Sequence, residues 1–585
     1  MTDSAASAAG RLAAALGLLL LCSMQTFAQP DDDFAITNVH VVPMDSERLL
    51  EDQVVLVIDG RIESIVSSAE ASIPAGLRRI DGGGRYLMPG LSDLHTHILH
   101  PDDLVNYLAW GVTTVMHLGG SGLPGTELLD IREKVAQGQR PGPVIYTTNR
   151  VFDGVPALNS RSLSIATPDM ARDEVRKLKA AGFDFVKIYN NVSRPVFDAI
   201  TDEARLQGLA VIGHIPRGFP ALQSLGGGQN AVAHTEEFFF TYFGGPRQTE
   251  DMPHDYVADL AKLPGLIDVL LENDVATMPD LSFAYTDHVM WDDLDTLWSD
   301  AEFEYLFPGT AAMWQAGTIN RRSSIENFVL REEWKYDLMQ TLTLAFQKAG
   351  ILQVIGTDTA LPGLFPGKAA HRELTELVKA GISRFDALAI GTRNGGEFVR
   401  KFIDPEARFG LVAEGYEATL VLLEENPLED VRHARDVAAV SVRGRWIERA
   451  EIDRMRAQLR GRYATINDAK ATAEAALLED GAEAIIRSLI EASTEDPETL
   501  ATIESTINSA GYSAAIAGDI DHSYDVLALN TRLFPRSANA WDSFAEITLH
   551  RGDRAAAISL YEKALEVDPG FENARRMIRE LQEAQ

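Results

Sequence analysis

The chain of 585 residues contains a single cysteine, Cys22. One thiol cannot form a disulfide within the chain, and it excludes zinc sites built from several thiolates. Any bound metal must therefore be held by histidine, carboxylate or modified lysine side chains. A Gly-x-Ser-x-Gly nucleophile elbow and a phosphate-binding glycine loop are also missing, and Asp81–Gly84 is typical of a turn.

Positive charge is scarce as well. Lys and Arg number 53 against 86 Asp and Glu, which gives a formal net charge of −33. So acidic a protein repels nucleic acid and anionic membrane surfaces. We therefore expect no nucleic-acid partner.

The N-terminal segment carries a short apolar run. Arg11 precedes the apolar residues 12–21, and Thr26–Ala28 has the small-x-small form of a cleavage site. This layout is typical of a secretory signal, and the run is too short to favour a spanning helix. We predict a signal peptide over residues 1–28, export to the periplasm or secretion, and no stable membrane span after cleavage. A membrane anchor is the alternative.

Two β-rich stretches lie far apart in the sequence. Residues 34–80 alternate like strands, with Asp59-Gly60 as a hairpin signal, and a similar pattern returns at 419–423 and 437–442. This arrangement predicts one small β-sandwich composed of residues 34–85 and 405–450.

The region between them repeats a different unit. Short β-rich runs at 112–116, 185–189, 209–213 and 352–356 alternate with helix-like segments, one of which begins at Pro195. Buried strands joined by helices are the pattern of a parallel α/β sheet. The length of this region fits a (β/α)8 TIM barrel over residues 86–404.

The C-terminal region is rich in Ala and Glu and carries an internal repeat. Phe534-Pro535 recurs as Asp568-Pro569, a period of 34 residues. Residues 538–571 resemble a tetratricopeptide repeat (TPR), and 504–537 do so more loosely. We predict an all-α, tetratricopeptide-like region over 470–585, with an unrelated helical hairpin as the alternative. Binding of a protein partner, self-association and bracing of the barrel all stay open as its role.

The strongest chemical signal is a His-x-His pair. His95 and His97 end a β-rich run that follows Pro89-Gly90. Residues i and i+2 of a strand point to the same side, so both imidazoles are expected to face the barrel interior. Two neutral imidazoles there would begin a divalent-metal site.

Three more polar residues occupy equivalent positions. His214 follows the β-rich run 210–213, His234 follows 231–233, and Asp358 follows 354–357. The carboxyl ends of barrel strands converge on one face, so the five residues are expected to meet there. Each alone would be read as a structural polar residue, but together they favour a metal site.

These segments resemble the amidohydrolase superfamily. The resemblance rests on Pro-Gly-Leu-x-Asp-x-His-x-His, the strand-end histidines and Gly356-Thr357-Asp358, and it extends over about residues 34–450. The subgroup most similar is the imidazolonepropionase-related, prolidase-like one. The resemblance implies that His95, His97 and Asp358 hold one metal ion and that His214 and His234 hold another. A carboxylated Lys187 would join the two ions; an unmodified, salt-bridged Lys187 in a mononuclear site is the alternative.

The expected activity follows from such a site. A divalent metal, with zinc as the expected ion and one or two per chain, lowers the pKa of bound water towards roughly 7. The resulting hydroxide would attack the carbonyl of a small amide, peptide-like or cyclic amide substrate, with Asp358 as general base and then acid. A mononuclear deaminase or cyclic-amide hydrolase is one alternative, and a catalytically inactive binding protein is another.

Three residues are candidates for substrate contact. His117 ends the run 113–116, although many relatives carry arginine there, and Tyr189 lies two residues after Lys187. Arg217 could bind a substrate carboxylate, with an ordinary loop ion pair as the alternative. The aromatic-rich stretch 238–330 could line the pocket, or could form a local core beneath a helical insertion.

Overall fold

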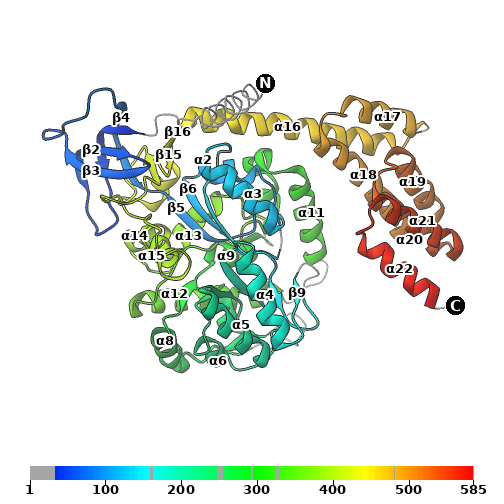
Figure 1. Ribbon diagram of the computed structural model, residues 1–585, viewed down its shortest axis with the longest axis horizontal. Coiled ribbons are helices and arrows are strands. Elements are labelled where there is room, and N and C mark those ends of the chain that lie inside the picture. The colour runs from blue at the N-terminus through cyan, green and yellow to red at the C-terminus, as the bar shows by residue number, and fades with distance from the viewer. Residues whose placement is uncertain are drawn as a thin grey trace, which may run out of the picture.

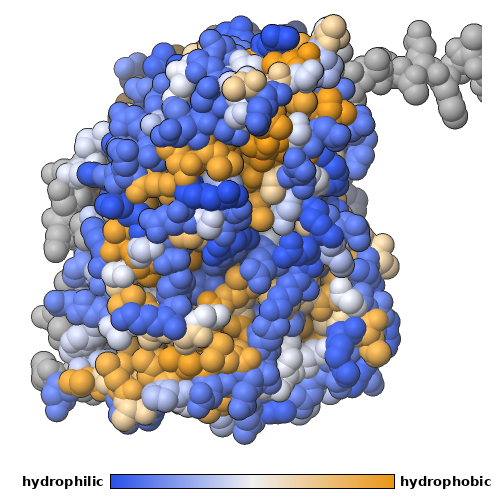
Figure 2. Space-filling view, turned by 90° about the vertical axis from the view of Figure 1, so that its left-hand side faces the viewer, coloured by the Kyte–Doolittle hydropathy of each residue, from blue (hydrophilic) through white to orange (hydrophobic). Residues whose placement is uncertain are grey.

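The computed structural model describes residues 33–583 except 121, 159–161, 247–254, 291–293, 323–327 and 480. The predicted signal peptide at 1–28 lies outside the described residues. In the part that is described, no helix has both the length and the apolar character to cross a membrane. The face drawn in Figure 2 is largely hydrophilic, with apolar side chains in separate patches.

The two β-rich flanks form one seven-stranded sheet, in the order β16-β15-β14-β4-β1-β2-β3. Its strands are β1 (Phe34–Val41), β2 (Leu50–Ile58), β3 (Arg61–Ser67), β4 (Arg78–Pro89), β14 (Leu420–Leu423), β15 (Val437–Val442) and β16 (Arg445–Glu448). The predicted hairpin at Asp59-Gly60 is confirmed, because Ile58 pairs with Arg61 across it. The flanks join where β4 runs antiparallel to β14.

This sheet is strongly curled. Four strand spacings separate β1 from β16, which would be about 19 Å in a flat sheet. The rings of Phe34 on β1 and Trp446 on β16 nevertheless lie with centroids 5.6 Å apart. One continuous sheet, with strands from both flanks, therefore encloses the apolar core.

The central region contains two parallel sheets that join into a ring. One consists of β5 (Leu91–Thr96), β6 (Val112–His117) and β7 (Val144–Thr147). The other runs in the order β13-β12-β11-β10-β8-β9 and consists of β8 (Phe152–Asp153), β9 (Leu163–Ser164), β10 (Phe185–Ile188), β11 (Ala210–Gly213), β12 (Ala231–Ala233) and β13 (Ala276–Met278).

The segment 352–359 connects the two sheets. One parallel bridge joins Gln353 to Thr277 in β13, and another joins Thr359 to Thr96 in β5. On the far side the Asp184 N–H donates to the Thr147 carbonyl at 3.0 Å, which links β10 to β7. The parallel strands thus follow one another around a ring, with helices outside it (Figure 1).

The α-helices of this region are α2 (Asp103–Ala109), α3 (Gly125–Ala136), α4 (Pro168–Ala180), α5 (Arg194–Gln207), α6 (Ala221–Leu225), α7 (Glu236–Thr241), α8 (Leu263–Glu272), α9 (Leu281–Met290), α10 (Leu294–Trp298), α11 (Pro308–Arg322), α12 (Phe328–Ala349), α13 (Lys368–Lys379), α14 (Arg384–Gly391) and α15 (Arg393–Phe402). Three short 3-10 turns accompany them: η1 (Leu260–Lys262), η2 (Ala301–Tyr305) and η3 (Val431–Arg435). The helix expected at Pro195 is α5, which has proline in its first turn and ends at Gly208 with φ of 64°.

The C-terminal region is helical. It contains α16 (Arg449–Ala476), α17 (Ala482–Ala492), α18 (Pro497–Ile516), α19 (Ile520–Leu533), α20 (Ala538–His550), α21 (Arg554–Val567) and α22 (Glu572–Glu583). The long α16 leads from the curled sheet past α2 to the other helices (Figure 1). Apolar contacts of Val105 in α2 with Leu459 and Tyr463 pack α16 against the central region.

The repeat of 34 residues has a structural counterpart. Gly518 and Gly552 both adopt left-handed backbone, with φ of 86° and 90°. The aspartate after each glycine caps the next helix: Asp519 accepts the His522 N–H, and Asp553 accepts the Ala556 N–H. The two units therefore start their second helices in the same way. The limits of the predicted segments 34–85, 86–404, 405–450 and 470–585 stay predictions.

Candidate metal centre

The six predicted metal ligands all come from the ring of strands. They are His95 in β5, His97 directly after it, Lys187 in β10, His214 after β11, His234 after β12, and Asp358 in segment 352–359. All are buried except His97, which is half-buried. The structure thus brings together residues separated by more than 250 positions in the sequence.

Asp358 lies at the centre of this group. Its Oδ1 is 2.8 Å from His97 Nε2 and 3.4 Å from His95 Nε2. Its Oδ2 is 3.9 Å from His234 Nε2. Burial would raise the pKa of Asp358, but the positive charge available on His95 and His234 outweighs it and holds this pKa below its ordinary value. The carboxylate is therefore ionised at neutral pH.

Lys187 is enclosed without a partner. Its side chain is 2% exposed, and Nζ has no hydrogen-bond partner among the described residues. Burial lowers the pKa of Lys187 to about 8, although Asp358 and Asp280 oppose the change. Within the described part of the chain, Nζ forms none of the salt bridges considered as an alternative. A buried amine with a lowered pKa is suited to reaction with carbon dioxide.

Asp280 was missed by the sequence analysis. It lies two residues after β13, and its Oδ2 is 2.9 Å from His95 Nδ1 and 2.7 Å from His234 Nδ1. Two trios of ligand atoms therefore fall within 4.8 Å: His95, His97 and Asp358, and His95, His234 and Asp280. The available signal was a carboxylate after a β-rich run, but Pro279 separates Asp280 from the end of that strand.

Three of these residues occupy an unusual backbone region. His234, Asp280 and Asp358 have φ of 68°, 52° and 54°, the left-handed region that side chains with a Cβ rarely adopt. Each such residue costs about 1–3 kcal/mol, and they concentrate at functional sites. All three lie at or just beyond the carboxyl ends of strand positions of the ring, where the backbone turns their side chains towards one another.

Two side chains contact the Nδ1 atom of His214. Its Nδ1 is 2.9 Å from Asn190 Oδ1 and 3.0 Å from Glu237 Oε1. Burial lowers the pKa of His214 to about 4, which keeps the imidazole neutral at physiological pH. For Glu237, burial is outweighed by His214 and Arg217, and its pKa falls to about 2. Glu237 was also missed, because nothing in the sequence distinguishes it from other helix carboxylates.

The structure separates two of the predicted substrate contacts. His117 is fully buried, and its Nδ1 accepts the Ile98 N–H at 3.1 Å, so it supports the loop after β5. Its ring lies 6.0 Å from that of His97. Tyr189 instead lies against His214, with ring centroids 4.1 Å apart. Both rings therefore lie beside a predicted ligand, Tyr189 beside His214 and His117 beside His97.

Arg217 takes part in an ion pair. Its Nη2 lies 3.0 Å from Glu237 Oε1, and its guanidinium is 5.0 Å from the Phe240 ring centre. This is the loop ion pair considered as the alternative to a substrate contact. Through Glu237, Arg217 is connected to His214.

The aromatic side chains of 238–330 mostly form local cores. Phe238, Phe239 and Phe243 belong to one buried cluster, and Trp314 with Phe303 to another. Phe283 is different, since its ring lies 5.9 Å from that of His234. Trp291, also in this stretch, lies outside the described residues. Phe283 is thus the apolar neighbour of the ligands from this segment.

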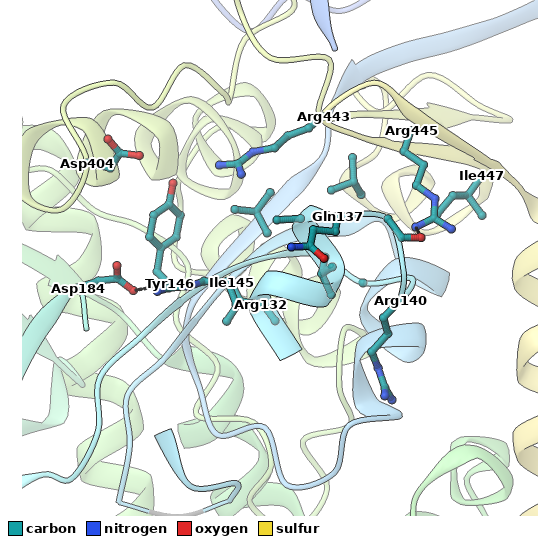
Figure 3. A pocket seen from close by; sticks show the side chains of 16 residues that line it. Arg132, Gln137, Arg140, Ile145, Tyr146, Asp184, Asp404, Arg443, Arg445 and Ile447 are labelled. Carbon is teal, nitrogen blue, oxygen red and sulfur yellow. Dashed lines mark hydrogen bonds and ion pairs between the residues drawn. The ribbon is translucent and has the colours of Figure 1, made fainter. Parts of the chain in front are cut away.

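A separate cavity of about 370 Å³ lies at the other end of the strands, between β7 and the β15–β16 turn (Figure 3). None of the predicted site residues lines it. Its charges are largely paired: Arg132 with Asp184 at 2.7 Å, and Arg443 with Glu417 at 3.0 Å. The cluster around Asp358 therefore remains the candidate site.

Comparison with known proteins gives local similarity to curated hydrolases, while no family profile matches the chain. An imidazolonepropionase of Stenotrophomonas maltophilia is 41% identical over 75 residues (12% of this chain, 18% of the relative). An ochratoxinase of Aspergillus niger is 38% identical over 96 residues (16% and 18%). An L-hydantoinase of Paenarthrobacter aurescens is 32% identical over 181 residues (29% and 35%). The chain spans 18% to 35% of the length of these relatives.

Solved structures share the fold over a larger part of the chain. A candidate prolidase from Bifidobacterium longum has a TM-score of 0.57 at 24% identity, covering 74% of this chain and 100% of that one. A bottromycin amidohydrolase has a TM-score of 0.58 at 20% identity, covering 74% and 91%. The α/β fold with parallel sheets is therefore similar to that of these amidohydrolase structures, and short stretches of the sequence are similar to an imidazolonepropionase and an L-hydantoinase.

Proposed function

We propose that the protein is a metal-dependent amidohydrolase that cleaves a C–N bond in an amide, peptide-like or cyclic amide substrate. The observation that carries the proposal is the convergence of three imidazole Nε2 atoms, from His95, His97 and His234, on Asp358. Names of the similar proteins, among them a hydantoinase and an amidohydrolase, support this reaction class.

The donor set fits a divalent metal. The Nε2 atom of His95 is buried and has no hydrogen-bond partner, and nitrogen and oxygen donors of this kind suit zinc. His95, His97 and Asp358 would hold one ion, and His214 and His234 a second. The buried, unpartnered Lys187 would join them once carboxylated. Metal bound there would supply Lewis acidity and lower the pKa of a water molecule.

Side chains of the protein would transfer the proton, orient the substrate and line the pocket. Asp358 is ionised at neutral pH, so it can accept the proton of the attacking water and return it to the leaving nitrogen. Tyr189 beside His214 is placed to orient the substrate. Phe283 near His234 offers an apolar wall for the group next to the scissile bond.

We extend the proposal to the finer assignments. The ring of parallel strands would be a (β/α)8 barrel, since β5, β6, β7, β10, β11, β12, β13 and segment 352–359 make eight strand positions. Residues 470–585 would be tetratricopeptide-like, supported by the equivalent caps at Asp519 and Asp553. Export to the periplasm or secretion rests on the sequence of residues 1–28, and the prolidase-like subgroup on the sequence resemblance.

A mononuclear enzyme acting on cyclic amides is the second candidate. It is favoured by the local similarity to an imidazolonepropionase and an L-hydantoinase. The isolated amine of Lys187 favours the bridged, two-metal form instead.

Metal analysis of purified protein lacking residues 1–28 tests the proposal. We expect about two equivalents per chain, falling to about one or fewer in Lys187→Ala. Lys177→Ala is the matched control, because that lysine is 69% exposed on α4 and should not affect metal content. Loaded protein should then hydrolyse members of a panel of dipeptides, N-acyl amino acids and cyclic amides. One equivalent that is insensitive to Lys187 would favour the mononuclear candidate, and protein that takes up no metal would overturn the proposal.

A further inference from the structure

Asp280 contacts two metal-site histidines from the side opposite to Asp358. Asp358 lies next to the Nε2 atoms of His95 and His234, at 3.4 and 3.9 Å. Asp280 lies next to the Nδ1 atoms of the same two rings, at 2.9 and 2.7 Å. The two nitrogens of an imidazole lie on different edges, so each ring is held between two carboxylates with distinct positions.

We propose that Asp280 is a positioning residue shared by the two metal positions, an inference that rests on the proposed function. By accepting Nδ1–H from His95 and lying 2.7 Å from Nδ1 of His234, Asp280 favours in both rings the tautomer that leaves the Nε2 lone pair free for metal. A carboxylate behind a ligating histidine also orients the ring and makes it a stronger ligand.

The shared acceptor couples the two positions. Oδ2 of Asp280 is hydrogen-bonded to His95 Nδ1 and lies 2.7 Å from His234 Nδ1, yet His95 belongs to one metal position and His234 to the other. When either His95 or His234 is oriented for metal, the Asp280 carboxylate is held in place as well. Its position then limits the orientation of the other imidazole. Binding of the first ion prepares the second position, and loading becomes cooperative.

The surrounding structure holds Asp280 rigidly. It is completely buried, and Cβ on Gly356 would lie 2.2 Å from its Oδ1. The next two N–H groups, of Leu281 and Ser282, donate to Glu373 at 3.0 and 2.5 Å. The carboxylate is thus fixed between the end of β13, the start of α9 and the segment that carries Asp358.

Direct metal ligation by Asp280 is the competing role. His95, His234 and Asp280 do lie within 4.8 Å of one another. An ion in that trio would occupy the Nδ1 edges, however, and would leave the Nε2 atoms beside Asp358 unused. The two roles differ in metal stoichiometry, so a titration distinguishes them.

The test is a zinc titration of the wild type, Asp280→Asn and Asp153→Asn, with unfolding of the metal-free proteins as a check on folding. Asp153 is the matched control, because it is equally buried at a strand end but accepts only backbone N–H groups. We expect Asp280→Asn to retain two equivalents, with affinity lowered about 10- to 100-fold and cooperativity lost. Asp153→Asn should titrate like the wild type.

The outcomes separate the two proposals. A wild type that binds no metal overturns the proposed function and this inference together. If the wild type binds two ions and Asp280→Asn binds them equally tightly, only this inference fails. A folded Asp280→Asn that loses one whole equivalent makes Asp280 a ligand and refutes the positioning role.

A second measurement uses the zinc-loaded wild type and does not require Asp280→Asn to fold. Nitrogen NMR of ¹⁵N-histidine-labelled, zinc-loaded wild type reports which ring nitrogen carries hydrogen. The inference requires Nδ1–H for both His95 and His234, assigned with His→Gln substitutions. Nε2–H at either residue overturns it.

Discussion

His100 Nε2 and Glu498 Oε1 lie 3.2 Å apart. His100 lies in the loop after β5, the strand that contains His95, whereas Glu498 belongs to α18 of the C-terminal region. The same loop contains Asp102, which accepts the Tyr463 hydroxyl of α16 at 2.8 Å. His100 also stacks on Phe307, with centroids 4.2 Å apart. The C-terminal helices therefore support the loop that leaves His95 and His97, which favours bracing among the roles left open by the sequence.

Loss of the Tyr463 hydroxyl should weaken this support. In Tyr463→Phe the buried carboxylate of Asp102 loses a neutral donor, while Arg140 and Arg462 remain in contact with it. We expect a loss of about 1 kcal/mol in the free energy of unfolding and weaker zinc binding. Urea unfolding and zinc titration measure the two effects. Tyr512→Phe removes a hydroxyl contact to Glu546 inside the helical region and should leave zinc affinity unchanged; an equal effect of both variants would contradict bracing.

His371 should make stability depend on pH. Burial lowers the pKa of His371 to about 4 from 6.5, and the ring donates Nε2–H to the Trp110 carbonyl. The folded state therefore favours the neutral ring. Its contribution is fully present above the unfolded pKa of 6.5 and is lost as pH falls through about 4.

The measurement compares wild type with His371→Gln, which keeps a donor but does not titrate. Between about pH 7.5 and about pH 5 the wild type should lose about 2 kcal/mol more of its free energy of unfolding than the variant. Equal pH dependence in urea unfolding would remove His371 as a source of acid sensitivity.

The sequence located much of the ring and predicted residues that the structure brings together, because those signals are local. Strand periodicity followed by a polar residue identified His214, His234 and Asp358, since strand ends in such sheets share one face. The hairpin at Asp59-Gly60 was equally local, because two residues determine the turn.

Local patterns could not identify the two carboxylates that contact the Nδ1 atoms of the histidines, Asp280 and Glu237. Asp280 does not directly follow its strand, because Pro279 lies between them, and Glu237 lies in a helix with no distinguishing pattern. Their importance depends on contacts across more than one element of the ring. The curl of the flanking sheet likewise depends on the distant packing of Phe34 on Trp446.

Gly356 should tolerate no side chain. Cβ there would lie 2.2 Å from Asp280 Oδ1 and 2.8 Å from His95 Cβ, both of them held in place. Gly356→Ala should therefore lower the free energy of unfolding by about 1–3 kcal/mol and reduce zinc content. Gly461→Ala is the control, since Cβ meets nothing within 4 Å in the middle of α16 and alanine favours the helix. Normal zinc content in Gly356→Ala would contradict this expectation, because it would show that Asp280 and His95 can shift to make room for the methyl group.

Arg217 should act through Glu237 whatever the substrate. Arg217→Met removes the cation 3.0 Å from Glu237, so the pKa of this buried carboxyl should rise and its hold on His214 weaken. We expect lower zinc affinity and a lower kcat for all substrates. Arg217→Lys, which keeps the charge, should recover part of both.

A direct contact with substrate would give a different result. Arg217→Met would then raise KM only for substrates with a free carboxylate and leave zinc affinity intact. Arg194→Met is the control, because Arg194 pairs with Asp198 on the exposed side of α5 and lies over Phe219 much as Arg217 lies over Phe240. Comparing zinc affinity with KM for one charged and one uncharged substrate decides between the two roles, because the ion pair with Glu237 connects the Arg217 side chain to His214.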